Sequence, residues 1–279
     1  GKTMIEMVIQ SVFFPVTVAI IIFLLPRLSW SVETERRIDV WTAAPAIAAA
    51  TLLSLYAVEG SEILHLAQKW YSLWISAIIL GFGGMVATVN FNQLGKPERA
   101  IGSEKTFVLA CTAAIAIFVL KMPNNEDVLM RLFLGAIAGI ATYLLSKPSS
   151  RAPVVMPLSF SFVLCMLVIL LMVSGSLKMG LIAASLSITS AACAILASVT
   201  RGFSGGASFS MAGITISIAL ALYGMSYHKN SDVPTAGWWI VALAPLLLCV
   251  ANCFQSRNAM ILGFVAILLA CIPLVVASI

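Results

Sequence analysis

Charged side chains are scarce in this chain of 279 residues, since Asp, Glu, Lys and Arg together make up only 10% of it. Hydrophobic residues account for 61%, and the mean hydropathy is +1.06. A water-soluble domain of this length cannot bury so large an apolar fraction. The composition therefore excludes a soluble protein and predicts an integral membrane protein of the all-α class.

Histidine is scarcer still, because the chain holds only His65 and His228. A transmembrane haem usually needs histidines that face each other across helices, so no haem is predicted. The six cysteines all fall inside apolar runs and lack metal-type spacing, which predicts buried thiols, no disulfide and no metal site. Ionisable residues are also missing from the middle of the runs, which disfavours an ion-coupled mechanism.

Long apolar runs dominate what is present. They cover residues 7–26, 41–58, 71–90, 106–122, 128–145, 154–174, 179–200, 208–227, 238–255 and 259–278. Several runs are short or nearly merge, so we predict a polytopic transmembrane helix bundle of about eight to ten spans. The connections are short, so residues 1–279 are expected to form a single integral membrane domain with no soluble domain.

Basic residues are unevenly divided between alternate connections. Ten lie on one side: Arg27, Arg36, Arg37, Lys96, Arg99, Lys105, Lys147, Arg151, Arg201 and Arg257. Six lie on the other: Lys2, Lys69, Lys121, Arg131, Lys178 and Lys229. The richer side is predicted to be cytoplasmic, with both termini outside. The net charge of +5 fits this asymmetry and contact with the lipid bilayer, not with nucleic acid, because no loop concentrates the basic groups.

The stretch EGSEILHLAQKW, residues 59–70, holds one of the two histidines. On a helix, Glu62, His65 and Lys69 fall within about 60° of one another, opposite an apolar arc. This pattern predicts an amphipathic segment at the outer interface, anchored by Trp70. Glu62 can contact His65 and favour the charged imidazole, which would provide a proton acceptor at the membrane edge. An ordinary interfacial helix with a solvated histidine is the alternative.

The order of features from residue 7 to about residue 70 resembles the membrane anchor subunits of dimethyl sulfoxide reductase and of the related polysulfide and nitrite reductases. It comprises one span, the charged loop SVETERRID, a second span and then LHL. In that family a His-Leu-Gly-x-Pro-x-Arg-Ala run follows the second span, and its histidine belongs to the menaquinol site. Here His65 matches the histidine, whereas the remainder matches NQLGKPERA at 92–100, which lacks histidine. Either stretch can correspond to the family's loop.

The resemblance implies an anchor subunit that binds and oxidises menaquinol and is not catalytic by itself. It would pass electrons to an iron–sulfur subunit, docked with a catalytic subunit on the outer face of a bacterial cytoplasmic membrane. His65 and Glu62 would accept protons. The residues expected to bind the quinol are His65, Glu59, Lys69, Trp70 and Arg99.

A small ten-span secondary transporter of the drug/metabolite type is the main alternative. The length and short loops fit, and prolines inside spans could break helices around a midplane site. These prolines are Pro15, Pro45, Pro157, Pro245 and Pro273. Two similar halves and inward-facing termini, which are typical of such transporters, are not evident.

Two enzyme classes are weaker alternatives. Residues 202–205, Gly-Phe-Ser-Gly, resemble the Gly-x-Ser-Gly of rhomboid proteases, but the only later histidine, His228, falls in a polar loop. Glu59 and Glu62 together with GFSGGAS resemble motifs of undecaprenyl-diphosphate phosphatases. The arginine expected in the second of those motifs is replaced by glycine, which removes the phosphate-binding cation.

We predict that residues 60–69 lie on the outer side of the membrane and that residues 27–40 and 93–105 lie on the cytoplasmic side, from the ten-to-six division of Lys and Arg. Single cysteines, Glu62→Cys and Glu98→Cys, would be placed in a background without the native cysteines. A membrane-impermeant maleimide applied to intact cells should label position 62 only. Labelling at 98 but not at 62 would reverse the orientation and exclude an outer site near His65.

Overall fold

A computed structural model of the chain describes residues 4–28, 38–39, 41–60, 72–88, 102–121, 127–199, 203–227, 234–254 and 257–277. Nearly all of these residues are helical. The helices are α1 (Met4–Val8), η1 (Ile9–Phe13), α2 (Phe14–Leu28), α3 (Ala43–Glu59), α4 (Leu73–Thr88), α5 (Ser103–Val119), α6 (Val128–Arg151), α7 (Val155–Val173), α8 (Leu177–Val199), α9 (Gly206–Tyr227), α10 (Thr235–Leu243), η4 (Ala244–Leu246), α11 (Leu247–Cys253) and α12 (Arg257–Val276).

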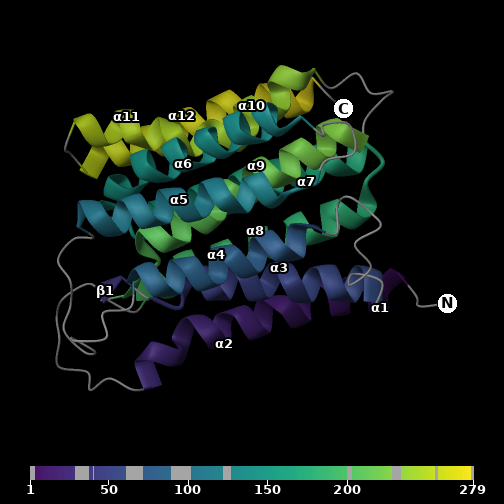
Figure 1. Ribbon diagram of the computed structural model, residues 1–279, viewed down its shortest axis with the longest axis horizontal. Helices are drawn as coiled ribbons and strands as arrows, with labels where there is room; N and C mark the ends of the chain where they lie inside the picture. The colour runs from purple at the N-terminus through teal and green to yellow at the C-terminus, as the bar shows by residue number, and fades with distance from the viewer. Residues whose placement is uncertain are drawn as a thin grey trace.

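The helices lie side by side along one axis and form a bundle whose two termini are at the same end (Figure 1). Each apolar run of the sequence corresponds to one helical segment, with α1–η1–α2 as the first and α10–η4–α11 as the ninth. Seven segments are long and apolar enough to cross a membrane, and α3 and α4 are shorter apolar helices. The prediction of a transmembrane helix bundle is confirmed, and the described residues contain no soluble domain.

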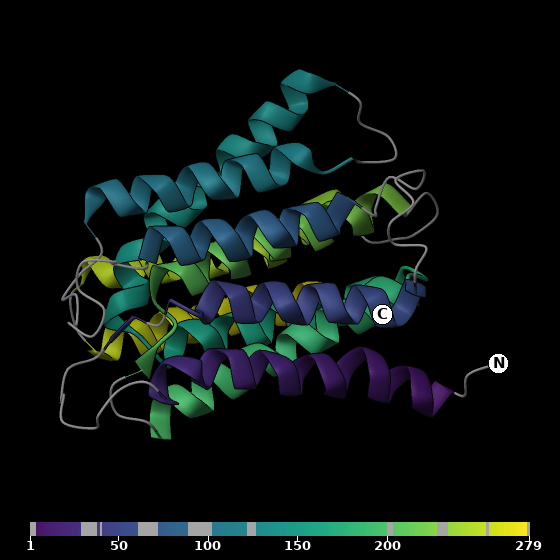
Figure 2. The same cartoon turned by 60° about the horizontal axis from the view of Figure 1, so that its bottom comes forward.

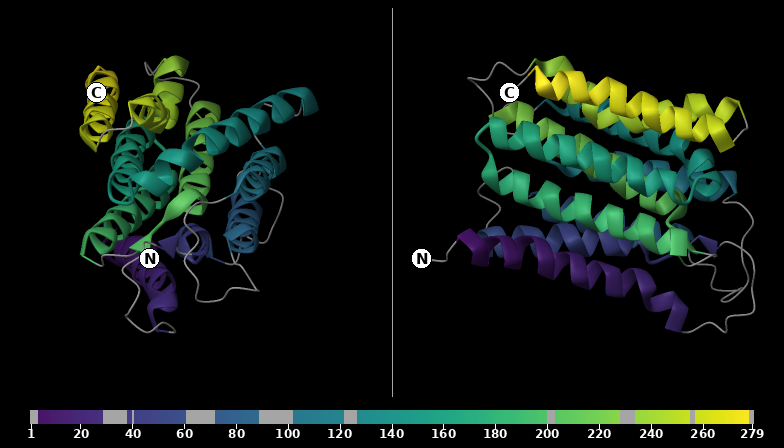
Figure 3. Two further views of the ribbon diagram at one scale, coloured as in Figure 1. Left: turned by 90° about the vertical axis from the view of Figure 1, so that its left-hand side faces the viewer. Right: turned by 180° about the vertical axis from the view of Figure 1, so that it is seen from behind.

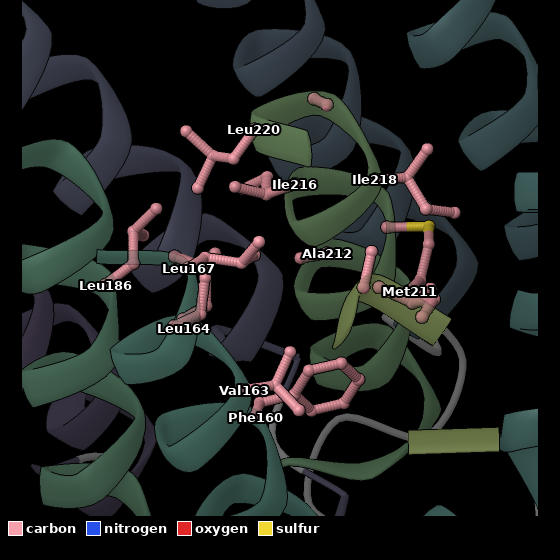
Figure 4. Packing of buried hydrophobic residues seen from close by; sticks show 14 of the residues in the cluster. Phe160, Val163, Leu164, Leu167, Leu186, Met211, Ala212, Ile216, Ile218 and Leu220 are labelled. Atoms are coloured by element: carbon pink, nitrogen blue, oxygen red, sulfur yellow. The ribbon is translucent and has the colours of Figure 1, made fainter. Parts of the chain in front are cut away.

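Helix α9 occupies the centre of the bundle. Its apolar window is 94% buried, whereas the windows of the first and last spans are each 33% buried. It packs against α3, α4, α5, α6, α7 and α10, which surround it when the bundle is viewed along its helices (Figure 3, left). Figure 2 shows the bundle lengthwise from another side. Phe160 of α7 meets Phe209 of α9 edge to face, with ring centroids 6.1 Å apart. Aliphatic side chains of α7 and α8 pack on the same side of α9 as Phe160 (Figure 4). From Gly206 to Gly224, helix α9 is therefore enclosed by other helices.

Small residues allow the closest helix pairs to form. A Cβ atom at Gly135 of α6 would lie 2.8 Å from the carbonyl oxygen of Ala114 in α5, and one at Gly139 would lie 3.0 Å from that of Ala110. Both distances are shorter than normal contacts, so only glycine fits at this helix crossing. The four-residue spacing of Gly135 and Gly139 in the sequence predicts such an approach, and the structure confirms it.

Pro15 explains a break in the first span. Its ring nitrogen carries no hydrogen, so it cannot donate to the carbonyl oxygen of Ser11 as an α-helix requires. The preceding turn is a π-helix, η1, in which the Phe14 N–H reaches back to the Ile9 carbonyl oxygen. The hydroxyl of Ser54 in α3 donates to the Ser11 carbonyl oxygen, which gives this buried acceptor a partner. This hydrogen bond therefore links the first span to the second span, α3.

The other prolines have different effects. Pro45 and Pro157 lie in the first turns of α3 and α7, where a missing N–H costs nothing. Pro245 lies in the 3₁₀ segment η4, which separates α10 from α11. Pro273 lies inside a continuous α12. Only Pro15 and Pro245 among the five therefore coincide with a change of helix type.

A short strand pair closes the end of the bundle opposite the termini. Residues Ile38–Asp39 (β1) pair in parallel with Phe203–Ser204 (β2), which directly precedes α9. The sequence patterns predict no strand here. Two connections far apart in the chain are joined beside the start of the central helix.

Replacing Gly135 or Gly139 with Leu should lower the yield of assembled, monodisperse protein, because the added side chain would force α6 away from α5. Size-exclusion chromatography in detergent measures this yield. Ile140→Leu is the matched control, since Ile140 is exposed on the next position of the same helix. If Gly135→Leu assembles as well as the control, the α5–α6 contact does not depend on glycine.

Candidate functional site

Glu59 is the one residue of the predicted quinol site that lies within the described part of the chain. Glu62, His65, Lys69, Trp70 and Arg99 lie outside it. The ends of the flanking helices nevertheless show where their segments attach. Residues 61–71 connect the end of α3 to the start of α4, and residues 89–101 connect the end of α4 to the start of α5.

The two stretches that share the family's motif attach to opposite ends of the bundle. Helix α4 separates them, and its 16 residues span about 24 Å. The segment with His65 attaches at the same end as the termini, whereas the segment with Arg99 attaches at the end closed by β1 and β2 (Figure 1). The stretches therefore define two separate candidate sites and not two parts of one site.

Glu59 is a buried carboxylate at the last position of α3. Its side chain is only 4% exposed, and its Oε1 lies 2.5 Å from Nζ of Lys178, whose side chain is 61% exposed. Gly60 ends the helix with a φ of +66°, and its N–H donates to the Tyr56 carbonyl oxygen. A negative charge at a helix C-terminus and a positive charge at the start of α8 both oppose the helix dipoles. Their mutual attraction is the interaction that favours this arrangement.

Further polar groups occupy the same end. The hydroxyls of Ser72 and Tyr223 are 3.2 Å apart, and the backbone N–H of Lys121 donates to Ser72 Oγ at 2.8 Å. These contacts tie the start of α4 to the ends of α9 and α5. The indole N–H of Trp74 is buried with no hydrogen-bond partner among the described residues. This end therefore combines a carboxylate, a phenol, a hydroxyl and an indole donor.

Ser72, Trp74 and Tyr223 were not singled out from the sequence. The sequence could have indicated Trp74, because it follows Trp70 by four residues, which is the spacing of neighbours on one helix face. The sequence gives no indication of Tyr223, since it lies in a long apolar run and only the packing of α9 brings it to Ser72.

Ser204, the candidate protease nucleophile, lies at the opposite end. It is 1% exposed, and its Oγ accepts the backbone N–H of Gly206 at 3.1 Å. The hydroxyl therefore accepts one of the backbone N–H groups that have no partner within the helix at the start of α9. His228 lies outside the described residues. A buried serine whose hydroxyl binds this N–H argues against the protease alternative.

Hydroxyl groups without partners lie at mid-depth. The side-chain oxygens of Thr142 (α6), Ser185 (α8), Thr215 and Ser217 (α9) are buried and have no hydrogen-bond partner among the described residues. Ser149 and Ser210 join α6 to α9 with their oxygens 2.5 Å apart. Thr142 and Ser217 lie seven residues beyond that pair along each antiparallel helix, and are therefore at the same level and on the same faces. Unpaired buried hydroxyls cost about 1–3 kcal/mol each, so this layer favours water or a polar solute.

Among the described residues, no group of three or more His, Cys, Asp or Glu side chains could hold a metal ion. Comparison of the chain with protein-family models, with curated proteins and with solved structures finds no match. The fold itself identifies the chain as a multi-pass helical membrane protein.

Lys178→Met should lower the thermal unfolding midpoint in detergent by about 2–4 °C, because it removes the cation beside a buried carboxylate while the exposed lysine limits the effect. Adding Glu59→Gln should restore most of the loss. Lys121→Met, at the same end of the bundle, is the control. Equal effects of the two lysine substitutions would show that the ion pair contributes nothing specific.

Proposed function

We propose that this chain is the membrane anchor subunit of a respiratory molybdoenzyme-type oxidoreductase and that it oxidises menaquinol where α3 ends. The observation that carries the proposal is Glu59, whose side chain is only 4% exposed at the end of a membrane helix. It directly precedes the segment that holds Glu62 and His65. Buried acidic groups at membrane depth are costly and commonly mark a function.

The chemistry explains why such groups are needed. Oxidation of a quinol to the quinone releases two protons and two electrons. His65, supported by Glu62, accepts the two protons one after the other from the quinol hydroxyls and returns each to water at the interface. Lys69, Trp70 and Glu59 are the residues proposed to bind the quinol ring at this end of the bundle. The two electrons leave to an iron–sulfur subunit.

The partners follow from this arrangement. The iron–sulfur subunit docks at the end of the bundle that carries the termini, and the catalytic subunit docks with it. The division of Lys and Arg orients this end toward the outside of a bacterial cytoplasmic membrane.

A ten-span secondary transporter is the second candidate. It is favoured by the layer of partnerless hydroxyls around α9 and by the changes of helix type at Pro15 and Pro245. Apart from Glu59 at the end of α3, the buried polar residues of the described chain are all Ser or Thr. Such an interior suits a small neutral solute, because it offers hydrogen bonds and no charge.

His65→Ala should slow quinol oxidation by roughly 10²–10⁴, the usual contribution of a general base, while the iron–sulfur partner still co-purifies. Turnover with artificial reductants that bypass the quinol site should persist. His228→Ala is the matched control, since it removes the chain's other histidine and should keep the quinol-dependent rate. Quinol-dependent turnover of the purified complex measures each outcome.

Wild-type quinol turnover in His65→Ala would move the site to the opposite end, near Asn92, Gln93 and Arg99. If the chain purifies alone, swelling of proteoliposomes in glycerol, erythritol or urea tests the transporter. If the wild-type proteoliposomes swell and the double variant Thr142→Val with Ser217→Ala does not, the transporter replaces the anchor subunit as the proposed function.

A further inference from the structure

The C-terminal end of α6 carries two cations at the level of the lipid headgroups. The helix has 24 residues and a length of about 36 Å, which exceeds the roughly 30 Å of a bilayer's hydrocarbon core. Lys147 and Arg151 lie in its last two turns and are both exposed. Because they are four residues apart, their side chains emerge on one face.

Arg151 is held across the seam between two helices. Its Nη1 donates to Oδ1 of Asn252 in α11 at 3.1 Å. This bond occupies one of the five N–H groups of the guanidinium and fixes its orientation at the α6–α11 seam. An arginine fixed in this way loses less freedom when it binds a phosphate than a fully mobile one.

The helices that form this corner lack acidic residues, and the acidic residues described at this end of the bundle lie in β1 and, at Glu104, in the first turn of α5. Asp232 is the only acidic residue between residues 128 and 279, and it lies in the connection after α9, at the other end of the bundle. Helices α6, α11 and α12 contain no acidic residue. Arg257 begins α12 at the same end as Arg151. The positive charge of Lys147 and Arg151 is therefore not balanced by an acidic residue of α6, α11 or α12.

Apolar side chains extend from the cations toward the membrane centre. Ile140, Tyr143 and Leu144 are exposed on α6 in the turns before Lys147. Val250 of α11 and Phe254, the residue that follows this helix, are also exposed. In a bilayer this surface faces acyl chains, so the corner offers an apolar surface that ends in two cations. Figure 1 shows α11 beside the end of α6.

We propose that the α6–α11 seam binds one anionic phospholipid, whose phosphate contacts Lys147 and Arg151 and whose acyl chains lie along Tyr143 and its exposed neighbours. Basic sites between membrane helices recognise anionic headgroups in this manner. A free phosphate would use the cations alone, whereas a phospholipid uses the apolar surface as well. The site is independent of the proposed quinol chemistry at the opposite end.

Native mass spectrometry of the detergent-purified full chain, titrated with phosphatidylglycerol, tests the proposal. Wild type should retain one phosphatidylglycerol in preference to phosphatidylcholine. Lys147→Met with Arg151→Met should weaken binding by roughly 10–30-fold, from the strength of single cation contacts with anionic lipid. Asn252→Ala, which keeps both charges, should weaken it less. Water-soluble glycerophosphate should not compete at equal concentration.

Lys105→Met with Lys121→Met is the control, since it removes the same charge from one half-buried and one exposed lysine outside the α6–α11 seam. An equal loss of binding in this control would overturn the proposal in favour of unspecific attraction. Equal retention of phosphatidylcholine would overturn it in favour of acyl-chain contact alone. Should the double variant fail to give monodisperse protein, Lys147→Met alone, on the exposed face, gives the same comparison.

Discussion

The enclosure of α9 by other helices is the constraint on which the rest of the structure depends. A helix that meets neither lipid nor water must satisfy its polar groups within the bundle, and its neighbours must approach it closely. Glycine makes this approach possible, as at Gly213 against Phe160 and at Gly224 against Trp238. Some hydroxyls bond within α9, as Ser226 does to the Leu222 carbonyl oxygen, or across to α6, as Ser210 does with Ser149. Thr215 and Ser217 of α9 have no partner among the described residues. The outer spans are arranged around this column.

The two ends of the bundle differ in chemistry. One end gathers the buried Glu59, the Tyr223 phenol and the indole of Trp74, which are groups that exchange protons or donate hydrogen bonds. The other end has Ser204 bonded to the start of α9, a strand pair and cations at the lipid boundary. Acid–base chemistry at one interface and lipid anchoring at the other are compatible roles for one membrane subunit.

Proline has two consequences in this bundle, which depend on its position in the helix. In a first turn it starts a span at no cost, and deeper in a helix it leaves a carbonyl oxygen without its donor. The Ser54 hydroxyl supplies that donor for Ser11, so the same residue that weakens one helix joins two. The hydroxyls of α6, α8 and α9 without partners have no such compensation, which gives the transporter alternative its physical basis.

The sequence by itself determined the class and the span pattern, because hydropathy and length decide which segments enter a membrane. It also predicted the Gly135–Gly139 contact, since small residues four apart share one helix face. Only the tertiary structure decided which span is central, because apolar runs look alike whether they face lipid or protein. The order of spans also predicted that the stretches with His65 and Arg99 attach to opposite ends. The tertiary structure decided that Glu59 meets Lys178 and that Tyr223 meets Ser72. These pairings depend on how the helices pack, and packing joins residues more than a hundred positions apart.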